Sequence, residues 1–71
     1  MTQETRIEIG QKIRSVREQN NLTQDQLALM VGIGRSYLAK VESGKRNPTV
    51  DFVEKVAGGL GMTLEELFKG L

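Results

Sequence analysis

Residues 23–44 constrain the fold most strongly, because they hold two short helical patterns separated by a turn of only about three residues. Thr23, followed three residues later by Gln26, matches a capping box and predicts the start of the first helix. Gly32 predicts its end, since glycine takes the left-handed conformation of a helix C-terminus without steric cost. A second helix is expected to begin at residue 34 or 35 and to end at 43–44. The segment therefore predicts two helices joined by a tight turn.

The residues before this segment also follow helical spacing, without the alternation that marks a strand. A capping box formed by Thr5 and Glu8 predicts the start of a first helix. The pair Asn20-Asn21 predicts its end, because asparagine tolerates turn conformations. The apolar stripe expected on this helix consists of Ile9, Ile13 and Val16.

Two more helices are expected after the segment. Thr49 can cap a fourth helix that Gly61 ends, and a capping box at Thr63 and Glu66 opens a short fifth helix. The residues expected on the inner face of the fourth helix are Val50, Val53, Ala57 and Leu60, with Phe52 on its outer face. These patterns predict an all-α fold, a compact bundle of five helices, that forms one domain over residues 1–71.

The composition excludes several classes of function. The chain has no cysteine and no histidine, so disulfides and the usual zinc ligand sets are excluded, and no metal or cofactor site is expected. A general base would have to be a carboxylate or a lysine, and no acidic pair lies in an apolar setting. A chain of 71 residues also offers little room for a substrate cavity. We therefore expect a protein that is not an enzyme.

The chain shows no signal peptide and no apolar run that approaches the ~20 residues of a membrane span. The lack of cysteine also fits a reducing compartment. The expectation is a soluble, cytoplasmic protein.

Charge is distributed unevenly along the chain, although the net charge is only +1. Residues 1–48 hold eight Lys or Arg against five Asp or Glu, whereas residues 49–71 hold two against four. Such asymmetry indicates that one side of the molecule meets an anionic partner. Ordinary scatter of surface charge is the alternative interpretation of the same numbers.

The second helix of the central pair has two distinct faces. Leu38 and Val41 are spaced to anchor it in the core. The residues left on its opposite, exposed face are Arg35, Ser36, Ala39 and Lys40. These side chains are short or basic, which suits a helix that must fit inside the major groove of DNA.

The string from Leu22 to Pro48 resembles the XRE family of helix-turn-helix regulators, which includes phage repressors and Cro proteins. The residues that carry the resemblance are Gln24, Ala28, Gly32, Glu42, Gly44 and Pro48. The similarity extends over about residues 9–68. It implies a five-helix bundle in which the third helix is the recognition helix. The family usually has Ser or Thr at the position of Gly34, so a hydroxyl contact to phosphate is not expected there.

The resemblance also implies roles for individual residues. Base contacts would be made by Arg35, Ser36, Lys40 and Ala39, the last through a thymine methyl. Phosphate contacts would be made by Gln24, Tyr37, Lys45, Arg46 and Asn47. Arg17 and Glu42 match positions that form an internal ion pair between the first and third helices.

The C-terminal part is expected to form a dimer interface, because Phe52, Leu64, Phe68 and Leu71 cannot all point inward together with the other apolar residues. Leu29 and Met30 are expected to be partly buried filler.

The predicted function is transcriptional regulation, as a repressor or activator, by a homodimer on a palindromic duplex operator. Phage-type repressor, restriction–modification controller and antitoxin remain open within this function. The alternative is a helical protein-interaction module, such as an antitoxin-type partner, without DNA binding.

Overall fold

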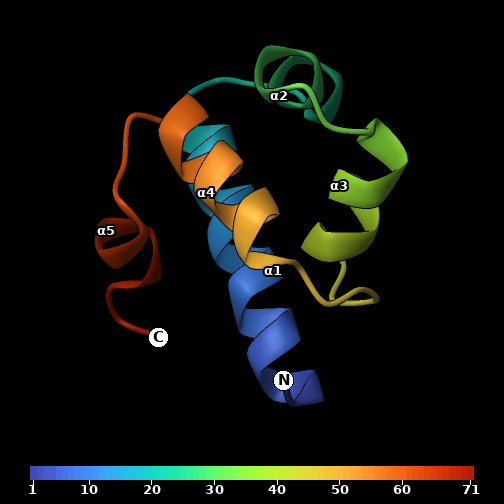
Figure 1. Ribbon diagram of the computed structural model, residues 1–71, viewed down its shortest axis with the longest axis vertical. Coiled ribbons are helices and arrows are strands. Elements are labelled where there is room, and N and C mark those ends of the chain that lie inside the picture. Colours follow the sequence, from blue (N-terminus) through green and yellow to red (C-terminus); the bar gives the residue numbers. More distant parts are fainter.

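The computed structural model describes all residues 1–71 and contains five helices and no strand, as the sequence predicts (Figure 1). The helices in chain order are α1 (Gln3–Gln19), α2 (Gln24–Val31), α3 (Arg35–Glu42), α4 (Val50–Gly59) and α5 (Leu64–Phe68). None of these helices is long and apolar enough to cross a membrane.

Local capping chemistry sets most of the helix boundaries. The capping boxes at Thr23 and Thr63 are present, and the Thr49 hydroxyl accepts from the backbone N–H of Phe52 at 3.1 Å. Gly32 ends α2 in the left-handed region with φ +71°. These caps confirm the predicted starts of α2, α4 and α5 and the predicted end of α2.

The predicted start of α1 is wrong. The helix begins at Gln3, with Thr2 as its N-cap, and the Thr2 hydroxyl accepts from the backbone N–H of Thr5 at 3.1 Å. The cap is therefore satisfied three residues earlier than the Thr5–Glu8 pattern suggests, and Thr5 lies inside the first turn. At the other end Asn21 has φ +58°, which confirms the expected turn.

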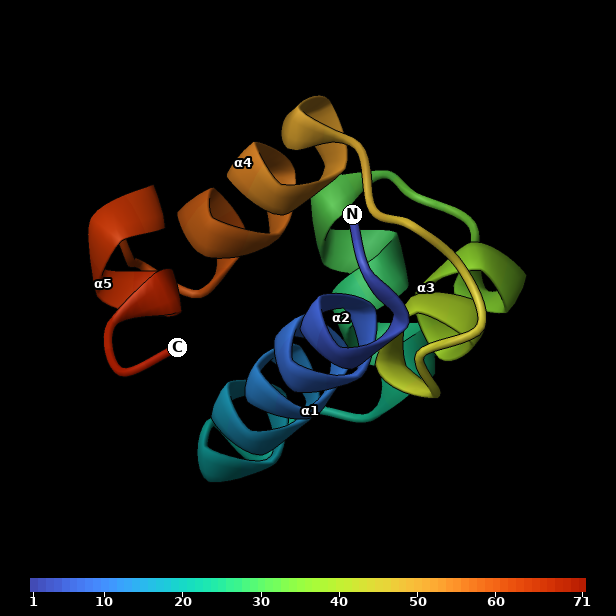
Figure 2. The same ribbon diagram turned by 90° about the horizontal axis from the view of Figure 1, so that it is seen from below.

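The core forms where all five helices meet. α1 packs against α3 and α5, α2 packs against α3 and α4, and α4 also packs against α5. Both ribbon views show α3 and α5 on opposite sides of α1 (Figures 1 and 2). The largest fully buried side chains are Ile13, Leu27, Leu38, Val41, Val56 and Leu67. One face of α3 is thus buried against the core, and its opposite face is exposed to solvent.

The predicted inner face of α4 is rotated from the observed one. Val50 is 67% exposed, whereas Phe52 is only 4% exposed, so both expectations for these residues are wrong. Phe52 packs edge-to-face on Tyr37 of α3, with ring centroids 4.7 Å apart and an interplanar angle of 76°. The burial of a large aromatic surface outweighs that of one valine and fixes the phase of the helix.

Gly10 permits a close approach that the sequence analysis did not anticipate. A Cβ on this residue would clash with the backbone oxygen of Val41 and would lie 2.9 Å from that of Glu42. Only glycine therefore lets α1 pack this tightly on the C-terminal end of α3. This contact sets the distance between α1 and the C-terminal end of α3.

Leu29 and Met30 were expected to be partly buried, and this is wrong for both, more clearly for Leu29. Its side chain is 86% exposed, and that of Met30 is 51% exposed. Leu27 and Ala28 already provide the buried face of the short helix α2, so the next two residues point outward.

Candidate nucleic-acid interface

The face of α3 that the sequence predicts to be free is free in the structure. Leu38 and Val41 are completely buried, while Arg35, Ser36 and Lys40 are exposed. Ala39 is half-buried, so it offers only part of its methyl surface. The helix therefore presents two cations and one hydroxyl outward.

The N-terminus of α3 carries no side-chain cap. Gly34 is the N-cap residue and makes no side-chain hydrogen bond to the first turn. The first backbone N–H groups of a helix have no partner within it, and together with the helix dipole they attract anions.

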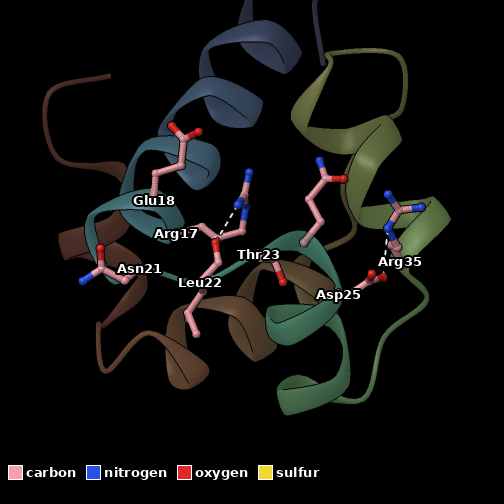
Figure 3. Close-up of a pocket in the computed structure, with 8 residues that line it drawn as sticks. Arg17, Glu18, Asn21, Leu22, Thr23, Asp25 and Arg35 are labelled. Atoms are coloured by element: carbon pink, nitrogen blue, oxygen red, sulfur yellow. Dashed lines mark hydrogen bonds and ion pairs between the residues drawn. The ribbon is translucent and has the colours of Figure 1, made fainter.

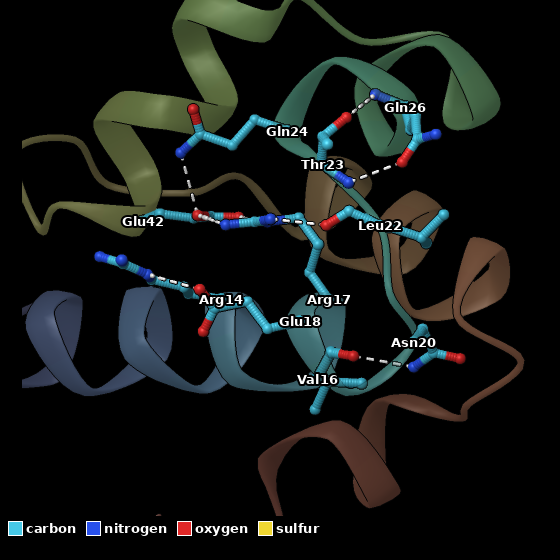
Figure 4. Close-up of polar contacts among 10 residues, drawn as sticks. All are labelled: Arg14, Val16, Arg17, Glu18, Asn20, Leu22, Thr23, Gln24, Gln26 and Glu42. Carbon is cyan, nitrogen blue, oxygen red and sulfur yellow. Dashed lines mark hydrogen bonds and ion pairs between the residues drawn. The ribbon is translucent and has the colours of Figure 1, made fainter.

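A buried ion pair joins α1 to the end of α3, as the family resemblance implied. Arg17 Nε donates to Glu42 Oε2 at 2.8 Å and Arg17 Nη2 donates to Glu42 Oε1 at 2.9 Å (Figure 4). Arg17 Nη1 also donates to the backbone oxygen of Leu22 at 2.7 Å. The hydrogen bond to Glu42 raises the pKa of Arg17 above its ordinary value, against the opposing effect of burial. Each of the three guanidinium nitrogens of Arg17 thus donates a hydrogen bond, and the two bonds to Glu42 hold α3 against α1.

Gln24 takes part in the same network. Its Nε2 donates to Glu42 Oε1 at 3.0 Å, and the side chain is half-buried at the first position of α2 (Figure 4). The amide keeps one N–H and its oxygen for a further partner. Gln24 therefore links α2 to the ion pair, a role that the sequence analysis did not assign to it.

Tyr37 holds the loop that follows α3. Its hydroxyl donates to the backbone oxygen of Asn47 at 3.2 Å and accepts from the backbone N–H of Thr49 at 3.3 Å. The Arg46 guanidinium lies 5.3 Å from the centroid of the Tyr37 ring. The hydroxyl proton that was expected to contact phosphate is therefore engaged within the protein. Lys45, Arg46 and Asn47 are all exposed on this loop.

A second ion pair lies at the opposite end of α3 and was missed by the sequence analysis. Arg35 Nε lies 2.9 Å from Asp25 Oδ1, and both side chains are largely exposed (Figure 3). The two residues belong to different helices, so no local spacing pattern connects them. The only signal in the sequence was that Asp25 lies in the first turn of α2. Stabilisation of the helix dipole is already a sufficient explanation for an acidic residue at that position.

The expected dimer residues do not share one environment. Phe52 belongs to the core, so its assignment to an exposed surface is wrong. Leu64 and Phe68 are half-buried, and Leu71 is 52% exposed. Leu64, Phe68 and Val50 line an apolar groove of about 170 Å³, which Ile9 of α1 and Met1 also line.

The arrangement can bind a polyanion along one side. Four exposed cations, Arg35, Lys40, Lys45 and Arg46, come from α3 and the loop after it. No group of three or more metal-ligating side chains comes together in the structure.

Comparisons with known proteins point the same way. The family model HTH_3, described as helix-turn-helix, matches residues 13–67. Control protein C.MunI of a Mycoplasma species is 37% identical over 67 residues, covering 93% of this chain and 90% of that protein. The crystal structure of the restriction–modification controller protein C.AhdI from Aeromonas hydrophila has a TM-score of 0.88 at 35% identity, covering 92% of this chain and 98% of that one. SinR, a master regulator for biofilm formation solved in complex with DNA, has a TM-score of 0.80 at 32% identity, covering 86% and 98%.

Proposed function

This chain belongs to the helix-turn-helix family HTH_3, also known as the XRE family, and we propose that it regulates transcription by placing α3 in the major groove of duplex DNA. The observation that carries the proposal is the exposed face of α3, which is held rigidly by the buried Arg17–Glu42 pair. The family consists of DNA-binding regulators, and nothing in the similarity favours a helical interaction module without DNA binding.

Base contacts come from the exposed face of α3 in this proposal. Arg35 stands at the start of the helix, where its guanidinium can donate two hydrogen bonds to guanine O6 and N7. Ser36 and Lys40 provide further donors, and the half-buried Ala39 offers a methyl group to thymine.

Phosphate contacts come from the flanks of α3. Lys45, Arg46 and Asn47 are exposed on the loop after the helix, and Gln24 lies at the N-terminus of α2. Tyr37 acts through the loop: its hydrogen bonds to Asn47 and Thr49 hold the phosphate-binding residues in place. This role replaces the direct phosphate contact expected from the sequence.

The acting unit is a homodimer on a two-fold symmetric operator. A single module of this size buries only about 600–1,000 Å² against DNA, which favours two copies on one site. Leu64, Phe68 and Leu71 form the proposed interface around α5, because they leave apolar surface uncovered in the monomer. Two copies that bind half-sites one helical turn apart must hold their recognition helices about 34 Å apart.

Sedimentation at micromolar concentration tests this interface. We expect a dimer for the natural sequence, and a monomer with weaker operator binding for Phe68→Glu, without loss of helical content. Leu71→Glu is the milder companion variant, since Leu71 is 52% exposed and outside the core. A natural protein that sediments as a monomer and occupies a palindromic site as one copy would contradict the dimer.

The role of controller fits this chain better than that of phage repressor or antitoxin. Two proteins similar to it are a control protein and a restriction–modification controller, and the similarity covers nearly their whole length. We therefore propose that the chain controls a small set of genes near its own. Footprinting on DNA upstream of its gene tests this role, and protection there is the expected result.

Selection of bound duplexes from a random library tests DNA recognition itself. The proposal predicts an enriched motif with two-fold symmetry, bound with an affinity that falls as salt rises. Enrichment of no motif, together with capture of a protein partner only, would favour the interaction module instead.

A further inference from the structure

The exposed ion pair between Asp25 and Arg35 connects the first turn of α2 to the first residue of α3 (Figure 3). The side chains are 75% and 62% exposed, respectively, so this pair contributes little to the stability of the fold. Its position matters more, since Arg35 is the residue proposed to contact a guanine.

The atoms involved determine what Arg35 can still do. A guanidinium presents its N–H donors in a rigid planar fork, and the Asp25 carboxylate lies 2.9 Å from the Nε edge of that fork. The contact with Asp25 is an ion pair without a hydrogen bond, and the two terminal nitrogens make neither kind of contact with the protein. A pair of parallel donors is what the O6 and N7 acceptors of guanine require.

We propose that Asp25 is a positioning residue for DNA recognition: its carboxylate attracts the Arg35 guanidinium at Nε and so favours side-chain orientations in which the two terminal nitrogens stay free for a guanine. This inference rests on the proposed function of α3. A free arginine side chain loses considerable rotamer freedom when it is ordered in an interface. An arginine whose guanidinium is already attracted to a neighbouring carboxylate has less of this freedom to lose.

The charge of Asp25 supports the same conclusion. A carboxylate beside a DNA-binding helix repels phosphate, so it weakens binding to every duplex. It also neutralises Arg35 in the free protein, which reduces the attraction of that side chain to phosphates at wrong sites. Displacement of water by DNA strengthens the pair, because the local dielectric falls. Asp25 thus lowers general affinity while it raises discrimination between sequences.

Helix-dipole stabilisation is the competing explanation for Asp25, because the residue lies in the first turn of α2. That explanation predicts a change in stability alone. It predicts no change in the choice of base at the position that Arg35 contacts.

The test compares affinities for the selected operator and for the same operator with the guanine at the Arg35 position replaced. A bidentate contact contributes roughly 5- to 150-fold discrimination at such a position. We expect Asp25→Asn to reduce this ratio by at least about 5-fold, the lower end of that range, while affinity for non-specific duplex rises. Asp25→Glu, which keeps the carboxylate, should recover part of the ratio.

Asp25 and Arg35 line a surface pocket that Glu18 also lines (Figure 3). Glu18→Gln is the matched control, because Glu18 pairs with Arg14 and not with Arg35. It removes one negative charge and should raise affinity for both duplexes equally, leaving the ratio unchanged. Thermal unfolding of each variant checks that the fold is intact. If Asp25→Asn also leaves the ratio unchanged, Asp25 acts through charge alone and the inference is overturned.

The background variant Arg35→Ala separates this inference from the proposed function. If Arg35→Ala keeps the natural base preference, the assignment of Arg35 itself fails. If it loses that preference, Asp25→Asn must have no further effect on the ratio in the Arg35→Ala protein. A further effect there would mean that Asp25 contacts a base directly, which would contradict a positioning role.

Discussion

The two arginine–carboxylate pairs at α3 use the same chemistry in opposite surroundings. Arg17 and Glu42 are buried and bidentate, with further hydrogen bonds from Gln24 and to the backbone of Leu22. The Arg35–Asp25 pair is exposed and makes a single close contact. A buried pair is strongly destabilising to break, whereas an exposed pair contributes about 0–1 kcal/mol. The first pair therefore stabilises the fold, whereas the second contributes little to stability and is the one proposed to act in recognition.

Breaking the buried pair should give the largest effect on stability. Glu42→Ala leaves the Arg17 guanidinium buried without its partner, which costs about 3–5 kcal/mol. For a domain of this size, each kcal/mol lowers the melting temperature by roughly 4–8 °C. Thermal unfolding followed by circular dichroism measures the change. The matched variant is Asp25→Ala, which should shift the melting temperature far less, and equal losses for the two variants would contradict the comparison.

A cation outside both pairs should affect only the salt dependence of binding. Lys45 is exposed and has no carboxylate partner within ion-pair distance. Each phosphate neutralised by a protein cation contributes about −0.9 to the slope of log K against log salt concentration. Lys45→Gln should flatten the slope by about that amount and leave sequence preference intact. Titrations at several salt concentrations provide the measurement, with Lys69→Gln on the far side as control, and a slope identical to the natural one would exclude the contact.

Local capping chemistry made much of the fold predictable. The boxes at Thr23 and Thr63 and the left-handed Gly32 depend on residues three or four positions apart, so the sequence contains their whole cause. Thr2 was not predicted as the cap because only Thr5 has the glutamate three residues later that completes a capping box. Such errors move a boundary by a few residues and leave the architecture unchanged.

Contacts between helices were harder to predict. The burial of Phe52 depends on Tyr37, and the close approach at Gly10 depends on the end of α3. Both are set by packing between residues distant in the chain, which helical periodicity does not encode. The Arg17–Glu42 pair could be foreseen only through the family resemblance, and the Asp25–Arg35 pair was not foreseen at all.

The sequence predicted which residues lie at the candidate site, but not the hydrogen bonds that some of them make within the protein. The exposed face of α3 follows from the spacing of Leu38 and Val41, and the structure confirms its exposure. The hydrogen bonds of Tyr37 and Gln24 inside the protein could not be predicted, since a polar side chain near a binding surface has the same sequence pattern whether it faces DNA or the loop.

The central claim is that the exposed end of α3 recognises bases while the buried end holds the helix. Repeating the duplex selection with Arg35→Ala tests it most directly. The account predicts that preference disappears at one base pair in each half-site, that operator affinity falls by about 1–3 kcal/mol, and that the melting temperature hardly changes. An unchanged selected motif at unchanged affinity would contradict the account.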